Sequence, residues 1–165
     1  MNPSLENHRL NQSGVAMLEV LITIVILAFG LLGFAGLNAA GIVSNHSSYL
    51  RSQAALQAYD MADRIRANLT GANTSMSYDN ISGAGTDPGC ILTGCTWVQM
   101  AAYDQWAWNA ANAALLPAGT GTVTRSGNFL IVTVMWDGDR KGATGTGCDN
   151  SNTADLKCFV LRAQP

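Results

Sequence analysis

Glu19 is the residue of this chain whose chemistry most needs explaining. The segment from Val15 to Leu37 is almost wholly apolar, and Glu19 is its only charged residue. A helix of about 20 such residues crosses the hydrocarbon core of a bilayer, and a carboxylate within it costs roughly 2.5–3.5 kcal/mol. The sequence therefore predicts either that Glu19 lies near the membrane interface or that it has a partner of opposite charge.

The four cysteines form two close pairs in the sequence, Cys90 with Cys95 and Cys148 with Cys158. Four cysteines allow three connectivities, and the sequence alone leaves all three open. We predict pairing within each close pair, because both lie in Gly-, Asn- and Thr-rich loops that a cross-link would constrain. A four-thiolate zinc site is the alternative, although neither pair has the C-x-x-C spacing typical of such sites. Disulfides indicate an oxidising compartment, which for a bacterial chain is the periplasm or beyond.

The histidines do not indicate a catalytic site. His8 and His46 are the only two, and no Ser/His/Asp or Cys/His set can be assembled around either of them. His46 falls on the polar part of an expected helix, where a solvated side chain is the simplest interpretation. We therefore expect no catalytic residue in this chain.

Two short motifs resemble ligand sites only in part. Asp137 and Asp139 hint at calcium, but two basic residues follow them, and Cys148 stands where an EF-hand needs glutamate. Residues 142–147 are rich in glycine like a phosphate loop, yet they lack the GK[ST] ending and a following helix. We expect a surface loop here, and neither metal nor cofactor.

The composition indicates one small core outside the apolar segment. The chain has 165 residues, of which 48% are hydrophobic and only 12% charged, against the ~25% charged residues usual in soluble domains. Net charge is −2, and no basic block suggests nucleic-acid binding.

The apolar segment predicts a membrane helix and hence a division of the chain. It is longer than the 7–15-residue core of a secretory signal. The downstream cysteines favour an N-terminus on the cytoplasmic side and the bulk of the chain outside. We predict residues 1–14 as a leader, 15–41 as a membrane helix and 42–165 as a periplasmic head.

One long helix is expected from about residue 15 to residue 70, without an interrupting proline. Its second half carries apolar or small residues at alternating steps of three and four, which indicates one packed face. Gly71 is expected to end the helix. The stripe consists of Val43, Ser47, Leu50, Ala54, Ala58, Met61, Ile65 and Leu69. Glycines at 30, 33, 36 and 41 either soften the helix or permit close helix–helix contact, and both remain open.

The head is predicted to be α+β. Residues 71–95 are expected to form a loop, and Thr96 with Gln99 has the form of a capping box before an Ala-rich helix from about 97 to 115. The aromatic residues of this helix are expected to anchor it to the core rather than to stack on a ligand. Strands at 122–125 and 129–136 read as a hairpin, and a third strand is expected at about 156–162.

The N-terminal segment resembles the signal of type IV prepilins. The residues that carry the resemblance run from Gly14 through Val15 to Glu19, followed by the apolar stretch 20–27. The resemblance implies cleavage by prepilin peptidase after Gly14 and N-methylation of Val15. It also implies that Glu19, the fifth residue after the cut, pairs with the terminal amine of a neighbouring subunit. Val15 departs from the Phe usual in main structural pilins.

The head resembles the PilV minor pilins. The carrying residues are Cys90 and Cys95, the segment 100–104 with Trp106, the pair 116–117, and the segment 132–137. The resemblance implies a pilin-like fold, a long helix on a small antiparallel sheet with a second helix and a disulfide-bonded C-terminal loop. It implies a subunit that helps to start the pilus at or near its tip, for motility and adhesion. The implied partners are other minor pilins, the major pilin, a tip adhesin, prepilin peptidase and the inner-membrane assembly platform.

Two other functions share part of this pattern. A pseudopilin of a type II secretion system uses the same signal and fold. A periplasmic ligand-binding or enzymatic domain on a membrane anchor predicts instead an uncut N-terminus, or a cut beyond Leu37.

Overall fold

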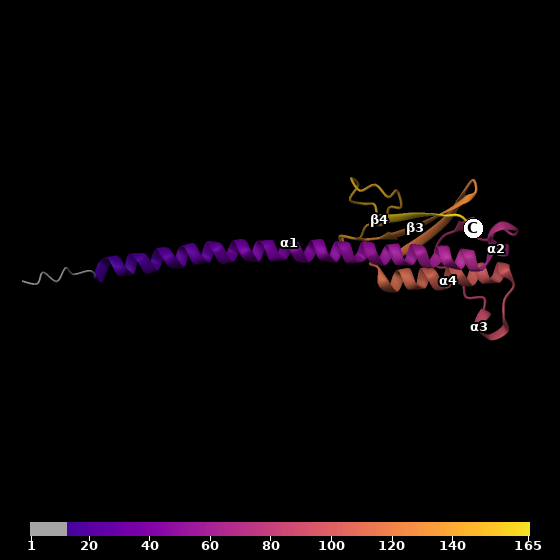
Figure 1. Cartoon of the computed structure of the whole chain (residues 1–165), viewed down its shortest axis with the longest axis horizontal. Coiled ribbons are helices and arrows are strands. Elements are labelled where there is room, and N and C mark those ends of the chain that lie inside the picture. Colours follow the sequence, from indigo (N-terminus) through magenta and orange to yellow (C-terminus); the bar gives the residue numbers. More distant parts are fainter. Residues whose placement is uncertain (1–12) are drawn as a thin grey trace, which may run out of the picture. The chain divides into compact units, whose positions relative to one another are not determined.

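Helix α1 (Ser13–Ala67) dominates the chain in the computed structural model (Figure 1). The structure describes residues 13–165, with side chains from Ala16 onward except that of Thr93. The chain divides into two compact units between Asn45 and His46. In the first unit every described side chain, from Ala16 to Asn45, is exposed, so α1 is packed against no other described residue there.

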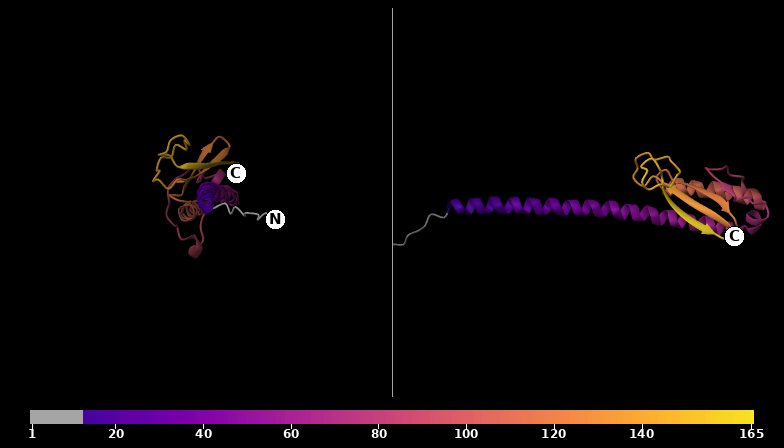
Figure 2. Two further views of the ribbon diagram at one scale, coloured as in Figure 1. Left: turned by 90° about the vertical axis from the view of Figure 1, so that its left-hand side faces the viewer. Right: turned by 90° about the horizontal axis from the view of Figure 1, so that it is seen from above.

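The second unit is an α+β head. Its elements after α1 are α2 (Leu69–Asn73), β1 (Asn80–Ile81), α3 (Cys90–Thr93), α4 (Trp97–Leu115), β2 (Thr120–Ser126), β3 (Phe129–Trp136) and β4 (Lys157–Ala163). The strands form one antiparallel sheet in the order β1-β2-β3-β4. Helix α4 runs beside the C-terminal part of α1, and the sheet covers the pair of helices (Figures 1 and 2). The predicted fold class is confirmed.

The central part of the predicted helical stripe forms one side of the core. Leu50, Ala54, Ala58, Met61 and Ile65 are each at most 2% exposed. The sheet contributes alternate residues of β3, as expected for a strand with one covered face, and α4 contributes the fully buried Trp108. The prediction is wrong at both ends of the stripe. Val43 precedes the head and Leu69 lies in α2, and both side chains are exposed.

The prediction that Gly71 ends the long helix is also wrong. Helix α1 ends at Ala67, and the Asn68 side chain then caps α2 by accepting a hydrogen bond from the Gly71 N–H at 3.2 Å. A Cβ on Gly71 would lie 2.5 Å from Asn68 Nδ2. Glycine is therefore needed here for the close approach of the cap and not for a helix stop.

Helix α4 begins and ends where its sequence signals place it. Thr96 and Gln99 form the predicted capping box, and the chain leaves the helix at Leu116, directly before Pro117. The Trp108 indole N–H donates to the Gln57 carbonyl of α1 at 2.8 Å, so one aromatic residue of α4 does anchor the helix. Trp97, by contrast, is 54% exposed.

A second, smaller core lies under the C-terminal loop. Met135, Ala143 and Leu156 pack together, with Cys148 and Cys158 beside them. The loop therefore covers part of the sheet. Strand β1 and helix α3 lie in the segment 71–95, where the sequence predicts only loop.

Gly121 of β2 lies directly against Trp108, and a Cβ at this position would overlap the indole ring. Its N–H donates to Asn109 Oδ1 at 2.6 Å, so the strand cannot move away without losing a buried hydrogen bond. We expect Gly121→Ala to lower the free energy of unfolding of the head by about 1–3 kcal/mol, as overpacking of a core usually does. Denaturant titration of the purified chain in detergent, followed by tryptophan fluorescence, measures this.

Thr124→Ala is the matched control, since its side chain is exposed on the same strand. It should cost less than about 1 kcal/mol. Equal losses for the two variants would contradict the assigned contact.

Candidate assembly site

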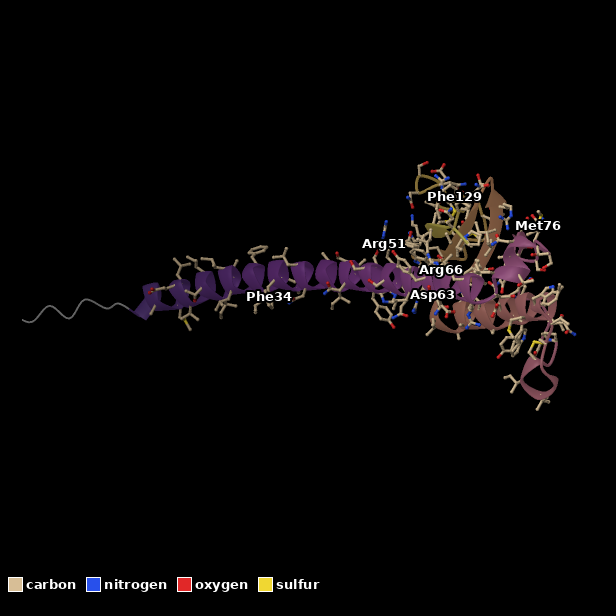
Figure 3. All side chains as sticks on the ribbon, turned by 45° about the vertical axis from the view of Figure 1, so that its right-hand side comes forward. Phe34, Arg51, Asp63, Arg66, Met76 and Phe129 are labelled. Carbon is tan, nitrogen blue, oxygen red and sulfur yellow. A yellow bond between two sulfur atoms is a disulfide. The ribbon has the colours of Figure 1, made fainter. Side chains whose placement is uncertain are left out.

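The first unit presents an apolar surface on all sides of one helix. Exposed side chains include Leu18, Ile26 and Phe34, which stands out from the helix in Figure 3. Covering each large apolar side chain is worth roughly 1.5–3 kcal/mol. Among the described residues, α1 is the one helix long and apolar enough to cross a membrane, by length and composition. This surface requires lipid or other helices around it.

Glu19 lies within this surface without an intramolecular partner. Its side chain is exposed, and no described residue forms a hydrogen bond or ion pair with it. The neighbouring Thr23 hydroxyl is satisfied within the helix, because it donates to the Val20 carbonyl at 2.8 Å. Among the described residues of this unit, Glu19 is the single charged side chain, and none of the others pairs with it.

The predicted cleavage point lies at the start of α1. Gly14 and Val15 belong to the helical backbone, but their side chains are not described. The predicted leader falls outside the described residues up to residue 12, as does His8. Cleavage after Gly14 and methylation of Val15 thus stay predictions.

At four positions in the exposed part of α1, no steric contact with the described residues requires a glycine. A Cβ on Gly30, Gly33, Gly36 or Gly41 would meet no atom within 4 Å. Each costs about 1 kcal/mol in helix stability relative to alanine. Any benefit that offsets this cost must come from contacts or from local bending that an isolated subunit does not show.

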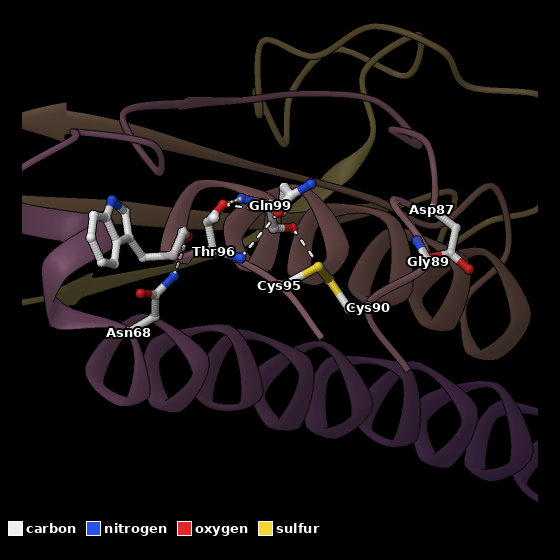
Figure 4. The surroundings of a disulfide bond; sticks show 8 residues. Asn68, Asp87, Gly89, Cys90, Cys95, Thr96 and Gln99 are labelled. Atoms are coloured by element: carbon white, nitrogen blue, oxygen red, sulfur yellow. Dashed lines mark hydrogen bonds between the residues drawn. A yellow bond between two sulfur atoms is a disulfide. The ribbon is translucent and has the colours of Figure 1, made fainter. Parts of the chain in front are cut away.

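The cysteines are joined within each close pair, Cys90 with Cys95 and Cys148 with Cys158. No sulfur is left as a thiolate ligand. Figure 4 shows the first disulfide beside the capping box at the start of α4. This bond closes the loop that contains α3, whose side chains Ile91 and Leu92 are 79% and 90% exposed.

The second disulfide fastens the C-terminal loop to β4, and Asp137 holds the other end of this loop. Asp137 Oδ2 accepts hydrogen bonds from the backbone N–H of Gly142 at 2.7 Å and of Ala143 at 3.3 Å. Desolvation by burial opposes ionisation, but the loop N–H groups outweigh it and lower the pKa of the Asp137 carboxyl. This carboxylate is used by the loop, and within the described part no three His, Cys, Asp or Glu side chains gather as a metal site.

A polar network that the sequence did not reveal joins α1, α4 and the segment before β1; we name it the Asp104 cluster. It consists of Asp60, Arg64, Asn68, Tyr78 and Asp104. Asp104 is 5% exposed and accepts hydrogen bonds from the Tyr78 hydroxyl at 2.5 Å and from Arg64 Nη1 at 3.2 Å. The hydrogen bond from Arg64 to Asp104 spans 40 residues, so no local motif could have indicated the cluster.

The Asp104 cluster is suited to positioning and not to proton transfer. Burial, and then the hydrogen bond to Asp104, raise the pKa of the Tyr78 phenol well above its usual range. Burial by itself lowers the pKa of Arg64. The hydrogen bonds and charges of Asp60 and Asp104 raise it by more, so the pKa is above its usual value and the guanidinium stays charged. The charged Arg64 joins α1 to α4, and the neutral phenol of Tyr78 joins the segment before β1 to α4.

The comparisons with known proteins bear on the middle of the chain. Residues 36–106 match the family described as Tt1218-like, type IV pilin Tt1218. The match runs from the glycine-containing part of α1 to the middle of α4 and includes the first disulfide. No curated protein matches the chain. No solved structure matches it either.

Removing the charge of Asp104 should loosen the head. We expect Asp104→Asn to lower the free energy of unfolding by about 1.5–3 kcal/mol, the usual worth of hydrogen bonds to a charged group. Asp63→Asn is the control: Asp63 pairs with Arg66 on the exposed side of α1 at 2.8 Å, and such pairs contribute about 0–1 kcal/mol. Denaturant unfolding of both variants decides, and a larger loss for Asp63→Asn would contradict a central role for Asp104.

Proposed function

We propose that this chain is a structural subunit of a bacterial type IV pilus, without catalytic activity. The observation that carries the proposal is the exposed apolar helix with one unanswered carboxylate, Glu19, five positions after Gly14. The match of residues 36–106 to a type IV pilin family supports it, as does the α+β head with its disulfide-bonded loop.

Assembly is the step in which this helix acts. Before assembly the helix lies in the inner membrane with the head in the periplasm, and in the filament neighbouring helices replace the lipid. The terminal amine of Val15 on a neighbouring subunit answers the Glu19 carboxylate. A buried ion pair of this kind adds little net stability, because desolvation offsets the attraction, but it sets the axial position of one helix against the next.

Within this function we propose the role of a PilV-type minor pilin. The resemblance of the head residues supports this assignment, and it implies a position at or near the tip with other minor pilins and an adhesin. The major pilin, prepilin peptidase and the inner-membrane platform are its remaining partners. A pseudopilin of a type II secretion system would share the helix and the head, so recovery in sheared pili distinguishes the two.

Processing gives the first test. We expect the mature protein to begin with N-methylated Val15, and Gly14→Val to block the cut, because a Cβ would intrude where the peptidase approaches the backbone. Intact-mass spectrometry of membrane fractions measures both. Ser13→Ala, one position earlier, should leave the mass of the mature chain unchanged.

A start beyond Leu37 in the wild-type protein would instead indicate an ordinary signal sequence. An intact Met1 would indicate an uncut membrane anchor. Either result would remove the basis for the pilin proposal.

The carboxylate gives the second test. We expect Glu19→Gln to be processed normally and to fall at least about ten-fold in sheared filaments, which corresponds to about 1.4 kcal/mol of lost docking free energy. Immunoblots of sheared and membrane fractions provide the measurement. Thr23→Val is the control one helical turn away, since the Thr23 hydroxyl is already satisfied by its own helix. Normal incorporation of Glu19→Gln would refute the pairing.

A further inference from the structure

The head contains a polar pocket of about 240 Å³ beside the second disulfide. Three segments that are distant in sequence form its walls: α1, the end of β3 with the turn that follows, and the C-terminal loop with the start of β4. The lining residues are Ser47, Arg51, Trp136, Gly138, Asp139, Asn150, Lys157 and Cys158. A water molecule needs at least about 10–15 Å³ of such space, so the pocket has room for a small organic ligand.

The two cations of this pocket lack the ion pairs that three other cations of the head form. Arg64, Arg66 and Arg125 each form an ion pair with an aspartate. Arg51 and Lys157 have no ion pair or hydrogen-bond partner in the described part of the chain, although both line the same pocket. Figure 3 shows Arg51 on the side of α1 that faces the sheet. Like charges facing one recess repel each other, so an anion between them would be attracted by both.

The other polar residues restrict what kind of anion fits. Asp139 is a hydrogen-bond acceptor without a partner among the described residues, and it would repel a bare oxyanion. Asn150 and Ser47 can both donate and accept. A ligand that complements these groups has a carboxylate for the cations and hydroxyl groups for Asp139 and Asn150.

The pocket is kept open by a glycine and held in shape by its surroundings. A Cβ on Gly138 would lie 3.0 Å from Lys157 Cγ and 3.3 Å from Trp136 Nε1, so a larger residue would fill the space between them. The disulfide at Cys158 and the Asp137 hydrogen bonds to Gly142 and Ala143 constrain the loop. A preorganised wall lowers the entropy cost of binding.

We propose that this pocket binds an acidic sugar of the hexuronate class. The sugar carboxylate lies between Arg51 and Lys157, and its hydroxyl groups donate to Asp139 and bond with Asn150. The indole N–H of Trp136, at the edge of the pocket, is a further donor to the ligand. The site adds recognition of acidic polysaccharide to the head and does not depend on whether the chain is assembled into a filament.

The test is an NMR titration of the full chain in detergent micelles with glucuronate. We expect the Trp136 indole N–H signal to shift with a Kd in the millimolar range, while the Trp108 indole N–H, which is bonded to Gln57 in the core, stays in place. Arg51→Gln and Lys157→Gln should each weaken binding at least about ten-fold. Arg66→Gln, a cation on α1 outside the pocket, is the matched control and should bind like the wild type.

Further probes identify the chemistry that is recognised. Glucose, which lacks the carboxylate, and sulfate, which lacks the sugar ring, should both bind at least about ten-fold more weakly than glucuronate. Equal binding of sulfate, or of polyglutamate as a model of an acidic protein surface, would overturn the assignment to a sugar acid. Absence of a Trp136 shift at high glucuronate concentration, or a shift that survives both pocket variants, would overturn the site itself. An unchanged Trp108 signal in each variant shows that the head is still folded.

Discussion

The close approach of two helices and a sheet at small side chains is the constraint on which the head depends. Ala54 and Ala58 of α1 are fully buried, in the same core cluster as Trp108 of α4. Gly121 lets β2 come against the Trp108 ring. Because protein interiors are packed to the density of organic crystals, a methyl group added at Gly121 has no room. The positions of α4 and the sheet follow from this packing.

The two halves of α1 have the same secondary structure but differ in which side chains are buried. In the head, a narrow stripe packs inward while the ion pair of Arg66 with Asp63 lies on the exposed side of the helix. In the first unit every described side chain is exposed and nearly all are apolar. Contact of this part of the helix with water is therefore unfavourable. Its glycines and Glu19 are costs to a single chain. Both become understandable when the helix is regarded as half of an interface.

Local signals in the sequence were sufficient for the elements that local interactions build. The limits of α4 followed from a capping box and a proline, and the hairpin from a turn-like tripeptide, 126–128, between two strand-like runs. In the structure Ser126 belongs to β2, so the turn is one residue shorter than predicted. The sequence did not predict β1, because two residues among glycines and serines form a strand only when β2 is beside them. Gly71 was misread because its role depends on where the Asn68 side chain lies. The link from Arg64 to Asp104 spans 40 residues and needs the finished fold. Glu19 could be identified from the sequence, because a single charged residue within an apolar segment is a local feature.

The row of buried residues along the last part of α1 also decides how the head responds to force. From Leu50 to Ile65 the helix contributes a core residue at nearly every turn, over about 22 Å at 1.5 Å per residue. A pull along the axis of α1 therefore loads all of these contacts at once, in shear, together with the Trp108 bond to Gln57. A pull across the axis would open them one after another. The same helix thus makes the head mechanically anisotropic, resistant along one direction and peelable along the other.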